Sequence, residues 1–382
     1  MTDMTEKLYY LDAYVSEFFA RVCSSFPCDG GYDTVLDKTA FFPQEGGQSC
    51  DMGTIDGARV TYVYEKDGIV HHVTDREIKG DRVFCKLDFD ERFVKMQCHT
   101  AEHILCGIIH RLFGLSNVGF HLGEEEVTFD VDGVLTREEL DGVEILANEV
   151  VFKNVPVTTL FPTSEELSRL EYRSKLDIKE NVRIVKIGEY DMCACCAPHV
   201  SHTGEIGLIK ILDFMKHRGG LRITMVAGRR ALLDYRTKYE NVKKISALTS
   251  APQLECADAV ERYMEEAEGV RAALKSAGLR IAELRAEAVK ESAGNAVFCL
   301  SDLTVPELIA FSNVANSKIG GITVALSGTD GDYKYVISSN NLSLEEKIKE
   351  INLALSGRGG GRGRMMQGSF GATLSQIEEY FK

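Results

Sequence analysis

The chain has 382 residues, of which 44% are hydrophobic and 27% charged, a composition typical of a globular protein of two or three domains. It has no apolar run of about 18 residues, and no basic segment followed by an apolar core near Met1, so we expect no membrane span or secretory signal and a cytoplasmic location. The formal net charge of −14 excludes bulk attraction to nucleic acid. Any contact with RNA must therefore use a local basic patch.

The first 89 residues have the pattern of a small antiparallel β-barrel or meander. Turn and hairpin dipeptides at Asp29-Gly30-Gly31, Asp67-Gly68 and Lys79-Gly80 separate short β-branched and aromatic segments. The predicted strands are residues 8–21, 34–42, 58–65, 69–73 and 82–87. Residues 1–89 are thus predicted to form a barrel-like subdomain.

The segment Gly46-Gly47-Gln48 lies between two of these strands. A glycine pair beside a side chain that both donates and accepts hydrogen bonds lets the backbone approach a polar ligand closely. A turn that closes a hairpin is the simpler interpretation of the glycines.

A helix predicted over residues 90–113, with Gly114 as its C-cap, carries His99 and His103. Four residues make about one helical turn, so both imidazoles lie on one face and can bind one metal ion from a rigid support. The alternative is two histidines on a helix face with no ligand. A second pair of ligands elsewhere in the chain would decide between these interpretations.

That second pair is present at Cys195 and His199, which are again four residues apart. Pro198 disfavours a regular helix, so we expect these residues on a turn. Three histidines and one cysteine complete a tetrahedral set of zinc ligands. Eleven cysteines in a chain without export signals should be reduced, so Cys193 or Cys196 could replace Cys195, and a zinc-free cluster of buried thiols is the other alternative.

Between the two ligand pairs, strands and helices follow in separate runs, which indicates an α+β fold. Thr136 and Glu139 have the spacing of a capping box at the start of a helix. The predicted elements are a strand at 127–131, a helix at 136–154, a strand beginning at 154–157, a helix at 164–172 and a strand at 182–187.

Residues 229–292 are predicted to form a helical hairpin, with helices separated by Ser250-Ala251-Pro252. The second helix carries apolar residues at alternating spacings of three and four over four heptads, from Val260 to Ala288. Several of these positions are alanine. A homodimer through this hairpin and an intramolecular spacer are both open interpretations.

Residues 293–382 alternate strands and helices and contain a segment rich in arginine and glycine. Gly357 to Arg364 holds five glycines and three arginines, which offer backbone amides and guanidinium groups to phosphates. A flexible linker is the equal alternative for this segment taken alone.

Taken together, these motifs resemble the editing domain of alanyl-tRNA synthetases and its free-standing, long-form relatives, the alanyl-tRNA editing proteins. The resemblance covers nearly the whole chain. It is carried by residues 36–43, Gly46-Gly47-Gln48, residues 92–97, His-x-x-x-His, Cys-x-x-x-His and Thr203-Gly204-Glu205-Ile206-Gly207. This chain has Cys196-Ala197-Pro198 where the family usually has Gly-Gly-Thr.

The resemblance implies a hydrolase that removes serine, and glycine as a further substrate, from mischarged tRNA(Ala). It implies one Zn²⁺ per chain, held by His99, His103, Cys195 and His199 in an editing domain at residues 90–228. It makes Thr39, Gly46, Gly47, Gln48 and Gln97 substrate contacts, with Thr39 recognising the serine hydroxyl. His121 either supports a metal ligand or is structural.

The resemblance also makes residues 293–382 a DHHA1-like tRNA-binding domain. Its tRNA contacts would be Arg358, Gly359, Gly360, Gly361, Arg362 and Arg364. This domain is a second surface through which a homodimer could form.

Two other classes of protein fit parts of the pattern. His99-Thr100-Ala101-Glu102-His103 also matches H-x-x-E-H, a metallopeptidase pattern in which the glutamate is the base, although Cys195 and His199 would fill positions that a protease leaves open. A non-catalytic RNA-binding protein with a structural zinc is the other rival, because four protein ligands fill the coordination sphere.

Overall fold

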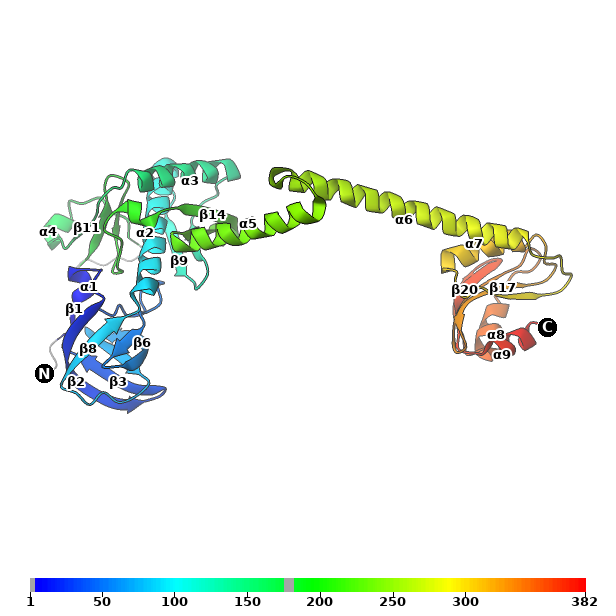
Figure 1. Cartoon of the computed structure of the whole chain (residues 1–382), viewed down its shortest axis with the longest axis horizontal. Helices are drawn as coiled ribbons and strands as arrows, with labels where there is room; N and C mark the ends of the chain where they lie inside the picture. The colour runs from blue at the N-terminus through cyan, green and yellow to red at the C-terminus, as the bar shows by residue number, and fades with distance from the viewer. Residues whose placement is uncertain (1–3, 175–181) are drawn as a thin grey trace. The chain divides into compact units, whose positions relative to one another are not determined.

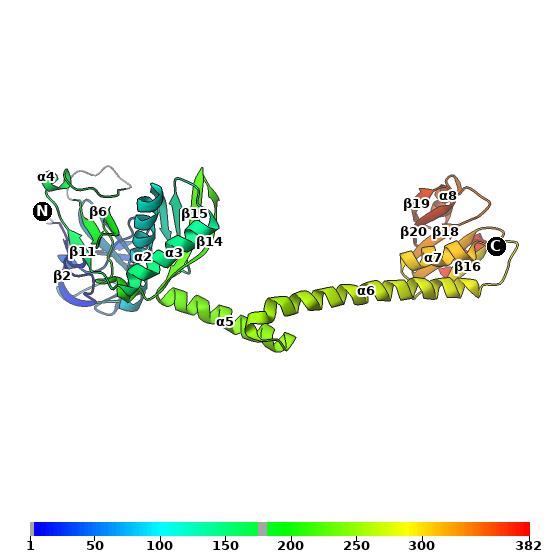
Figure 2. The same cartoon turned by 90° about the horizontal axis from the view of Figure 1, so that it is seen from above.

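The structure is a computed structural model that describes residues 4–174 and 182–382. It divides into two compact units, Met1–Asn241 and Val242–Lys382 (Figures 1 and 2). The fold is mixed α+β, as predicted, with several separate sheets. Among the described residues, no helix has the length and apolar character needed to cross a membrane.

The first unit begins with a closed six-stranded barrel, which confirms the predicted barrel. In β8, every second residue is buried, as expected where one face of a strand lines a core. The barrel strands, in spatial order, are β2 (Glu17–Cys28), β3 (Gly31–Leu36), β7 (Ile69–Thr74), β6 (Ala58–Lys66), β5 (Gly53–Ile55) and β8 (Arg82–Leu87). A short parallel pair, β1 (Glu6–Lys7) with β4 (Lys38–Thr39), lies outside this barrel.

The predicted strand over residues 8–21 is only partly correct. Its first residues form a single helical turn, α1 (Leu8–Leu11), and β2 begins at Glu17. The predicted strand over residues 34–42 is likewise divided between the end of β3 and the two-residue β4. In α1, Tyr9 is buried and packs edge-on against Phe42, and this contact holds the turn beside the barrel.

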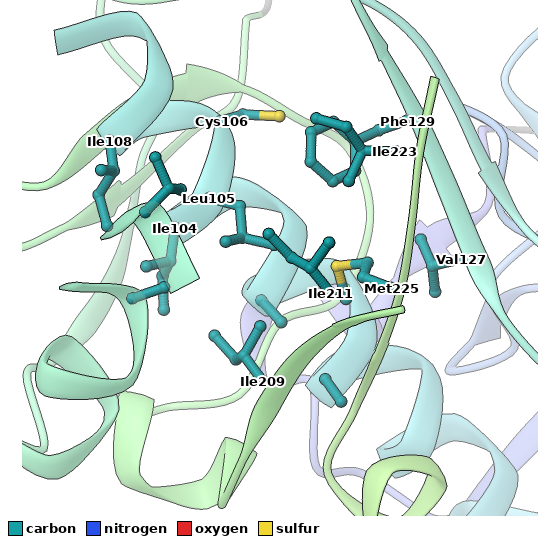
Figure 3. Packing of buried hydrophobic residues seen from close by; sticks show 14 of the residues in the cluster. Ile104, Leu105, Cys106, Ile108, Val127, Phe129, Ile209, Ile211, Ile223 and Met225 are labelled. Carbon is teal, nitrogen blue, oxygen red and sulfur yellow. The ribbon is translucent and has the colours of Figure 1, made fainter. Parts of the chain in front are cut away.

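The central element of the first unit is α2 (Phe89–Phe113), which confirms the predicted helix almost to the residue. Gly114 ends it in the left-handed conformation, with φ of 70°. In Figure 3, Ile104, Leu105 and Ile108 point into a core shared with strands of an adjacent sheet, together with Phe129, Ile223 and Met225. Most of the helix is buried, so polar residues on it are held in fixed surroundings.

That adjacent sheet has the order β14-β15-β10-β9 and is antiparallel throughout. Its strands are β9 (Asn117–Leu122), β10 (Val127–Val131), β14 (Ile209–His217) and β15 (Gly220–Ala227). The helix α3 (Arg137–Phe152) begins at the predicted capping box of Thr136 and Glu139. β9, β14 and β15 were not among the predicted elements.

A second small sheet carries the other predicted ligands. It has the order β11 (Val157–Leu160), β12 (Ile184–Ile187) and β13 (Asp191–Ala194). The helix α4 (Ser164–Leu167) is shorter than predicted, and a 3₁₀ turn, η1, spans Thr203–Ile206. Part of the predicted strand over residues 182–187 is β12. The chain leaves β13 at Ala194, directly before Cys195.

The helix α5 (Arg229–Thr249) has the predicted bounds and crosses the boundary between the two units. The 3₁₀ turn η2 (Gln253–Glu255) follows, and after it comes α6 (Cys256–Glu287), the long helix of the second unit. The heptad seam on α6 is exposed at its large apolar positions, Val260, Tyr263, Val270, Leu274, Ile281 and Leu284. Where the two helices meet, the Cys256 thiol lies 3.8 Å from the carbonyl oxygen of Val242, and Ile245 of α5 and Val260 of α6 line the same hollow.

The second unit ends in a five-stranded mixed sheet with helices on both faces. Val336 and Ala325 share one hydrophobic cluster with α7 (Val305–Ala315) and with Ala282 and Ala286 of α6. Both views show α7 beside α6 (Figures 1 and 2). The other face packs against α8 (Lys347–Ala354) and α9 (Leu374–Tyr380). The strands in spatial order are β16 (Ala296–Cys299), β17 (Thr323–Thr329), β18 (Asp332–Ser338), β20 (Met365–Phe370) and β19 (Arg358–Arg362).

The arginine and glycine segment forms an edge strand and not a flexible linker. β19 pairs with β20 from Arg358 to Arg362. A Cβ at Gly359 would lie 2.3 Å from the carbonyl oxygen of Gln367 and 2.7 Å from the hydroxyl of Tyr335, so only glycine fits there. The glycines therefore allow close packing of the strand, while Arg358 and Arg362 remain exposed.

Candidate metal centre

The structure brings the four predicted ligands together in the first unit. The ligand atoms of His99, His103, Cys195 and His199 all lie within 4.8 Å of one another, and the three histidines are buried. The Cys195 Sγ is 3.3 Å from Nε2 of His199 and 3.7 Å from Nε2 of His99. Tetrahedral bonds of about 2.0–2.3 Å place ligand atoms about 3.3–3.8 Å apart, so these separations suit a metal ion.

Each imidazole ring is fixed by a partner on its outer nitrogen. His103 Nδ1 donates to the Asp191 carboxylate at 2.8 Å, and His99 Nδ1 lies 2.9 Å from the side-chain oxygen of Gln48. His199 Nδ1 is 3.0 Å from the Thr100 hydroxyl. Because that hydroxyl gives its only proton to the carbonyl of Met96, it accepts from His199. All three histidines therefore carry their proton on Nδ1.

This arrangement leaves three Nε2 lone pairs directed at one thiol. Neutral imidazole acceptors cannot hydrogen-bond to one another, and a metal ion at the centre of the group would satisfy all three Nε2 lone pairs and the sulfur together. The residues thus fit a metal ion by their geometry and by the chemistry of their donor atoms.

Charges within the cluster are consistent with this interpretation. Burial opposes ionisation of Cys195, but the neighbouring His99 and His199 outweigh it and hold the pKa of the thiol well below its usual range. Burial lowers the pKa of His199 to about 3, so its imidazole is neutral. Burial would also lower the pKa of His103, but the hydrogen bond to Asp191 and the nearby thiols raise it well above the usual value. A proton and a metal ion therefore compete for Nε2 of His103.

Asp191 is held in turn by Arg173, a residue that the sequence did not single out. Arg173 donates from Nε and Nη2 to the two carboxylate oxygens at 2.7 and 3.0 Å. Burial would raise the pKa of Asp191, but the hydrogen bonds and charges of His103 and Arg173 lower it. This bidentate pair fixes the carboxylate that orients the His103 ring.

The segment that presents Cys195 and His199 is braced by Arg183, the residue directly before β12. The Cys195 amide donates to the carbonyl of Arg183 at 3.0 Å, and Arg183 Nη1 donates to the carbonyls of Cys195 and Ala197. Residues 195–200 have no helical structure, which confirms the turn predicted from Pro198.

A cavity of about 320 Å³ opens onto this cluster. Its lining includes the ligands His99, His103 and Cys195, together with Tyr10, Glu45, Gly46, Glu102, Arg183 and Cys196. The Glu102 carboxylate lies 4.0 Å from Nε2 of His103. A small molecule or the end of a chain can therefore reach the metal ligands from one side.

The predicted substrate residues fall into two groups. Gln48 is buried against His99, and Gly46 lines the cavity. A Cβ at Gly47 would lie 2.4 Å from the carbonyl oxygen of Phe120, so this glycine permits close contact with β9. Thr39 is fully buried and does not line the cavity; its hydroxyl lies 2.9 Å from His72 Nε2.

Gln97 and His121 lie apart from the cluster. Gln97 donates to the carbonyl of Glu205 at 2.8 Å and accepts from the amide of Arg229, so it joins η1 to the start of α5. Two residues along a helix turn through about 200°, which directs Gln97 away from the face of His99. His121 is exposed on β9 and lines a separate hollow beside Gly46, Gly47 and Gln48.

The chain is similar to known proteins over most of its length. Residues 182–224 match the family described as "Threonyl and Alanyl tRNA synthetase second additional domain". The alanyl-tRNA editing protein AlaX-L of Pyrococcus horikoshii is 28% identical over 98% of this chain and 96% of its own length. The alanine–tRNA ligase of Halorubrum lacusprofundi is 31% identical over 87% of this chain, which spans only 38% of that enzyme.

The chain is therefore related to the editing and C-terminal regions of alanyl-tRNA synthetases. More particularly, it is a homologue of the alanyl-tRNA editing protein AlaX-L. Among solved structures, the C-Ala domain of Aquifex aeolicus alanyl-tRNA synthetase matches 23% of this chain and 85% of its own length, with 20% identity and a TM-score of 0.20, too low to establish a shared fold.

Substitution of the three neighbouring cysteines should identify the thiolate ligand. Cys195→Ser should lower zinc affinity by more than the roughly 100-fold that loss of an outer contact costs, because it removes a ligand atom. Cys193→Ser and Cys196→Ser should retain one zinc per chain. Zinc content after dialysis against a competing chelator measures this, with Cys256→Ser of the second unit as the control. Loss of zinc from Cys193→Ser with retention in Cys195→Ser would reverse the assignment.

Proposed function

We propose that this protein is an aminoacyl-tRNA deacylase that removes serine, and also glycine, from mischarged tRNA(Ala). The observation that carries the proposal is the cluster of His99, His103, Cys195 and His199 at the wall of an accessible cavity, in a homologue of an alanyl-tRNA editing protein. The metal proposed for the cluster is Zn²⁺, one per chain, because zinc takes three imidazoles and one thiolate in tetrahedral geometry.

The reaction is transfer of an acyl group to water. Water adds to the ester carbon, the bond to the ribose oxygen breaks, and the products are the free amino acid and the tRNA hydroxyl. Bound zinc would supply a Lewis acid that positions the end of the tRNA or polarises the ester. The carboxylates of Glu45 and Glu102 line the cavity and are suited to the α-ammonium group of the aminoacyl ester.

Recognition of serine is proposed for Thr39. His72 Nδ1 donates to the carbonyl of Thr34, and burial lowers the pKa of His72 to about 4, so its Nε2 accepts the Thr39 proton. Phe41 donates its amide to the same hydroxyl. Thr39 is buried outside the cavity, so a substrate can reach it only by displacing the residues that cover it. In that state the second lone pair of the Thr39 oxygen would accept a hydrogen bond from the serine hydroxyl, which glycine lacks.

Binding of tRNA is proposed for the edge strand β19 and the turn after it. The exposed Arg358, Arg362 and Arg364 pair with no carboxylate among the described residues, and β19 pairs on one side only. Free guanidinium groups beside unpaired backbone amides suit phosphate oxygens. This strand supplies the local basic patch that the acidic net charge requires.

A non-catalytic tRNA-binding protein with a structural zinc is the second candidate. It is favoured by the four protein ligands, which leave no open position on the metal. A metallopeptidase is less compatible with the cluster, because Cys195 and His199 would fill the positions that the water and substrate need.

Incubation with seryl-tRNA(Ala) distinguishes these functions. The wild-type protein should release serine, removal of zinc by a chelator should abolish release, and added zinc should restore it. Alanyl-tRNA(Ala) is the control and should remain charged. Binding of tRNA without release of serine would support the non-catalytic alternative.

Thr39→Val should slow hydrolysis of the seryl ester by at least about 10-fold more than that of the glycyl ester, because it removes the proposed contact to the hydroxyl. It should also lower the free energy of unfolding by about 1–3 kcal/mol, since His72 and the Phe41 amide lose a buried partner. Thr39→Ser keeps the hydroxyl and is the matched control for both measurements. Equal loss on the two esters would exclude a role in selecting serine.

Replacement of Arg358, Arg362 and Arg364 by glutamine should raise KM for whole tRNA. It should also reduce the slope of log KM against log salt concentration by about 0.9 for each phosphate contact that is lost. Hydrolysis of 3′-O-seryl-adenosine, which lacks the tRNA body, should not change. Arg280→Gln on α6, where the arginine is paired with Glu283 and Glu287, controls for loss of surface charge. An unchanged KM in the triple variant would count against this surface.

A further inference from the structure

Arg183 is a buried cation in the wall of the cavity that holds the metal ligands. Only 7% of the residue is exposed, and its guanidinium carbon lies 5.4 Å from the centre of the Tyr10 ring. Its Nη1 donates to the carbonyls of Cys195 and Ala197 at 2.8 and 2.9 Å. The guanidinium group is thus anchored directly beside the backbone of a metal ligand, with Tyr10 as its neighbour in the cavity.

This cation has no counter-ion of its own. Within residues 4–174 and 182–382 it pairs with no carboxylate, although Glu45 and Glu102 line the same cavity. Its Nε–H is buried and has no hydrogen-bond partner. An unpaired buried charge with an unsatisfied donor is costly, so such a group in a folded protein requires an explanation.

We propose that Arg183 is the anion-binding residue of this cavity and that the substrate supplies the anion. The shared chemistry is a negatively charged oxygen: the ester carbonyl oxygen as water attacks, or a phosphate oxygen of the terminal nucleotide. Arg183 donates hydrogen bonds and transfers no proton. This inference rests on the proposed deacylase function and adds to it the group that neutralises charge in the reaction.

The alternative role for Arg183 is only to brace the turn from Cys195 to His199 through its two carbonyl contacts. A brace would act through the metal ligands, whereas an anion-binding group acts on turnover when the metal is fully bound. The two roles therefore differ in whether excess zinc restores activity.

The test compares wild-type protein with Arg183→Met, which keeps an unbranched apolar stem but removes the guanidinium group, and Arg183→Lys, which keeps the charge. Zinc content, kcat and KM are measured on seryl-tRNA(Ala) and on 3′-O-seryl-adenosine, which has no phosphate. At full zinc content, Arg183→Met should lower turnover by about 10²–10³-fold and Arg183→Lys by less, as for loss of one donor to a developing charge. Arg222→Met, where the arginine pairs with Asp130 on the surface of the same unit, is the control.

The two substrates separate the sources of the anion. An equal fall in kcat on both assigns the carbonyl oxygen, and a rise in KM confined to the tRNA assigns a phosphate. Unchanged constants at full zinc content, or activity restored to either variant by saturating zinc, would overturn the proposal.

If Arg183→Met cannot be loaded with zinc, the same criteria apply to Arg183→Lys. Wild-type protein that releases no serine would refute the proposed function, and this inference with it, whereas active wild type with unaffected variants refutes this inference alone.

Discussion

The site depends on the hydrogen bonds that fix one proton on the outer nitrogen of each histidine. These bonds come from three parts of the first unit: Gln48 in a loop of the barrel subdomain, Thr100 on α2, and Asp191 at the start of β13. Each hydrogen bond sets both the orientation and the tautomer of its imidazole ring. The inward lone pairs therefore exist only when the barrel, α2 and the strand pair β12–β13 are assembled. The metal-binding geometry is therefore a property of the whole unit and not of the four ligands.

A buried ion pair links α2 to the loop of the barrel subdomain that holds Gln48. Arg92 Nε donates to Asp51 at 2.8 Å, and Asp51 also accepts the amide of Phe42. This carboxylate thus closes the loop that contains Gly47 and Gln48 onto the same helix that carries His99. Breaking such a pair costs about 3–5 kcal/mol, although its net contribution against an apolar pair is small. Its effect here is to fix where Gln48 lies.

Local patterns predicted the elements that local interactions define. The apolar period of α2, the αL position of Gly114 and the capping box at Thr136 depend on neighbours within a few residues, and each was confirmed. The four-residue spacing of His99 and His103 likewise predicted that both imidazoles lie on one face of α2. The roles of Asp191, Arg173 and Gln48 depend on pairing across 18 to 88 residues, which no local pattern carries. Gln97 is different, because helix phase alone would have placed it away from His99.

The two units differ in where their charged residues lie. In the first unit, the charges of Asp191 and Arg173 beside the metal ligands are largely buried and paired, so a change of one partner alters the chemistry of the site. In the second, the arginines of β19 are exposed on a strand whose glycines pack tightly, so their charges can change affinity at little expense to the fold. Under the proposed function, affinity for tRNA and the hydrolytic step should respond to different conditions, because phosphate contacts are screened by salt and metal coordination is not. An acidic protein could then bind an acidic substrate, since the proposal needs attraction only at local groups such as the exposed arginines of β19.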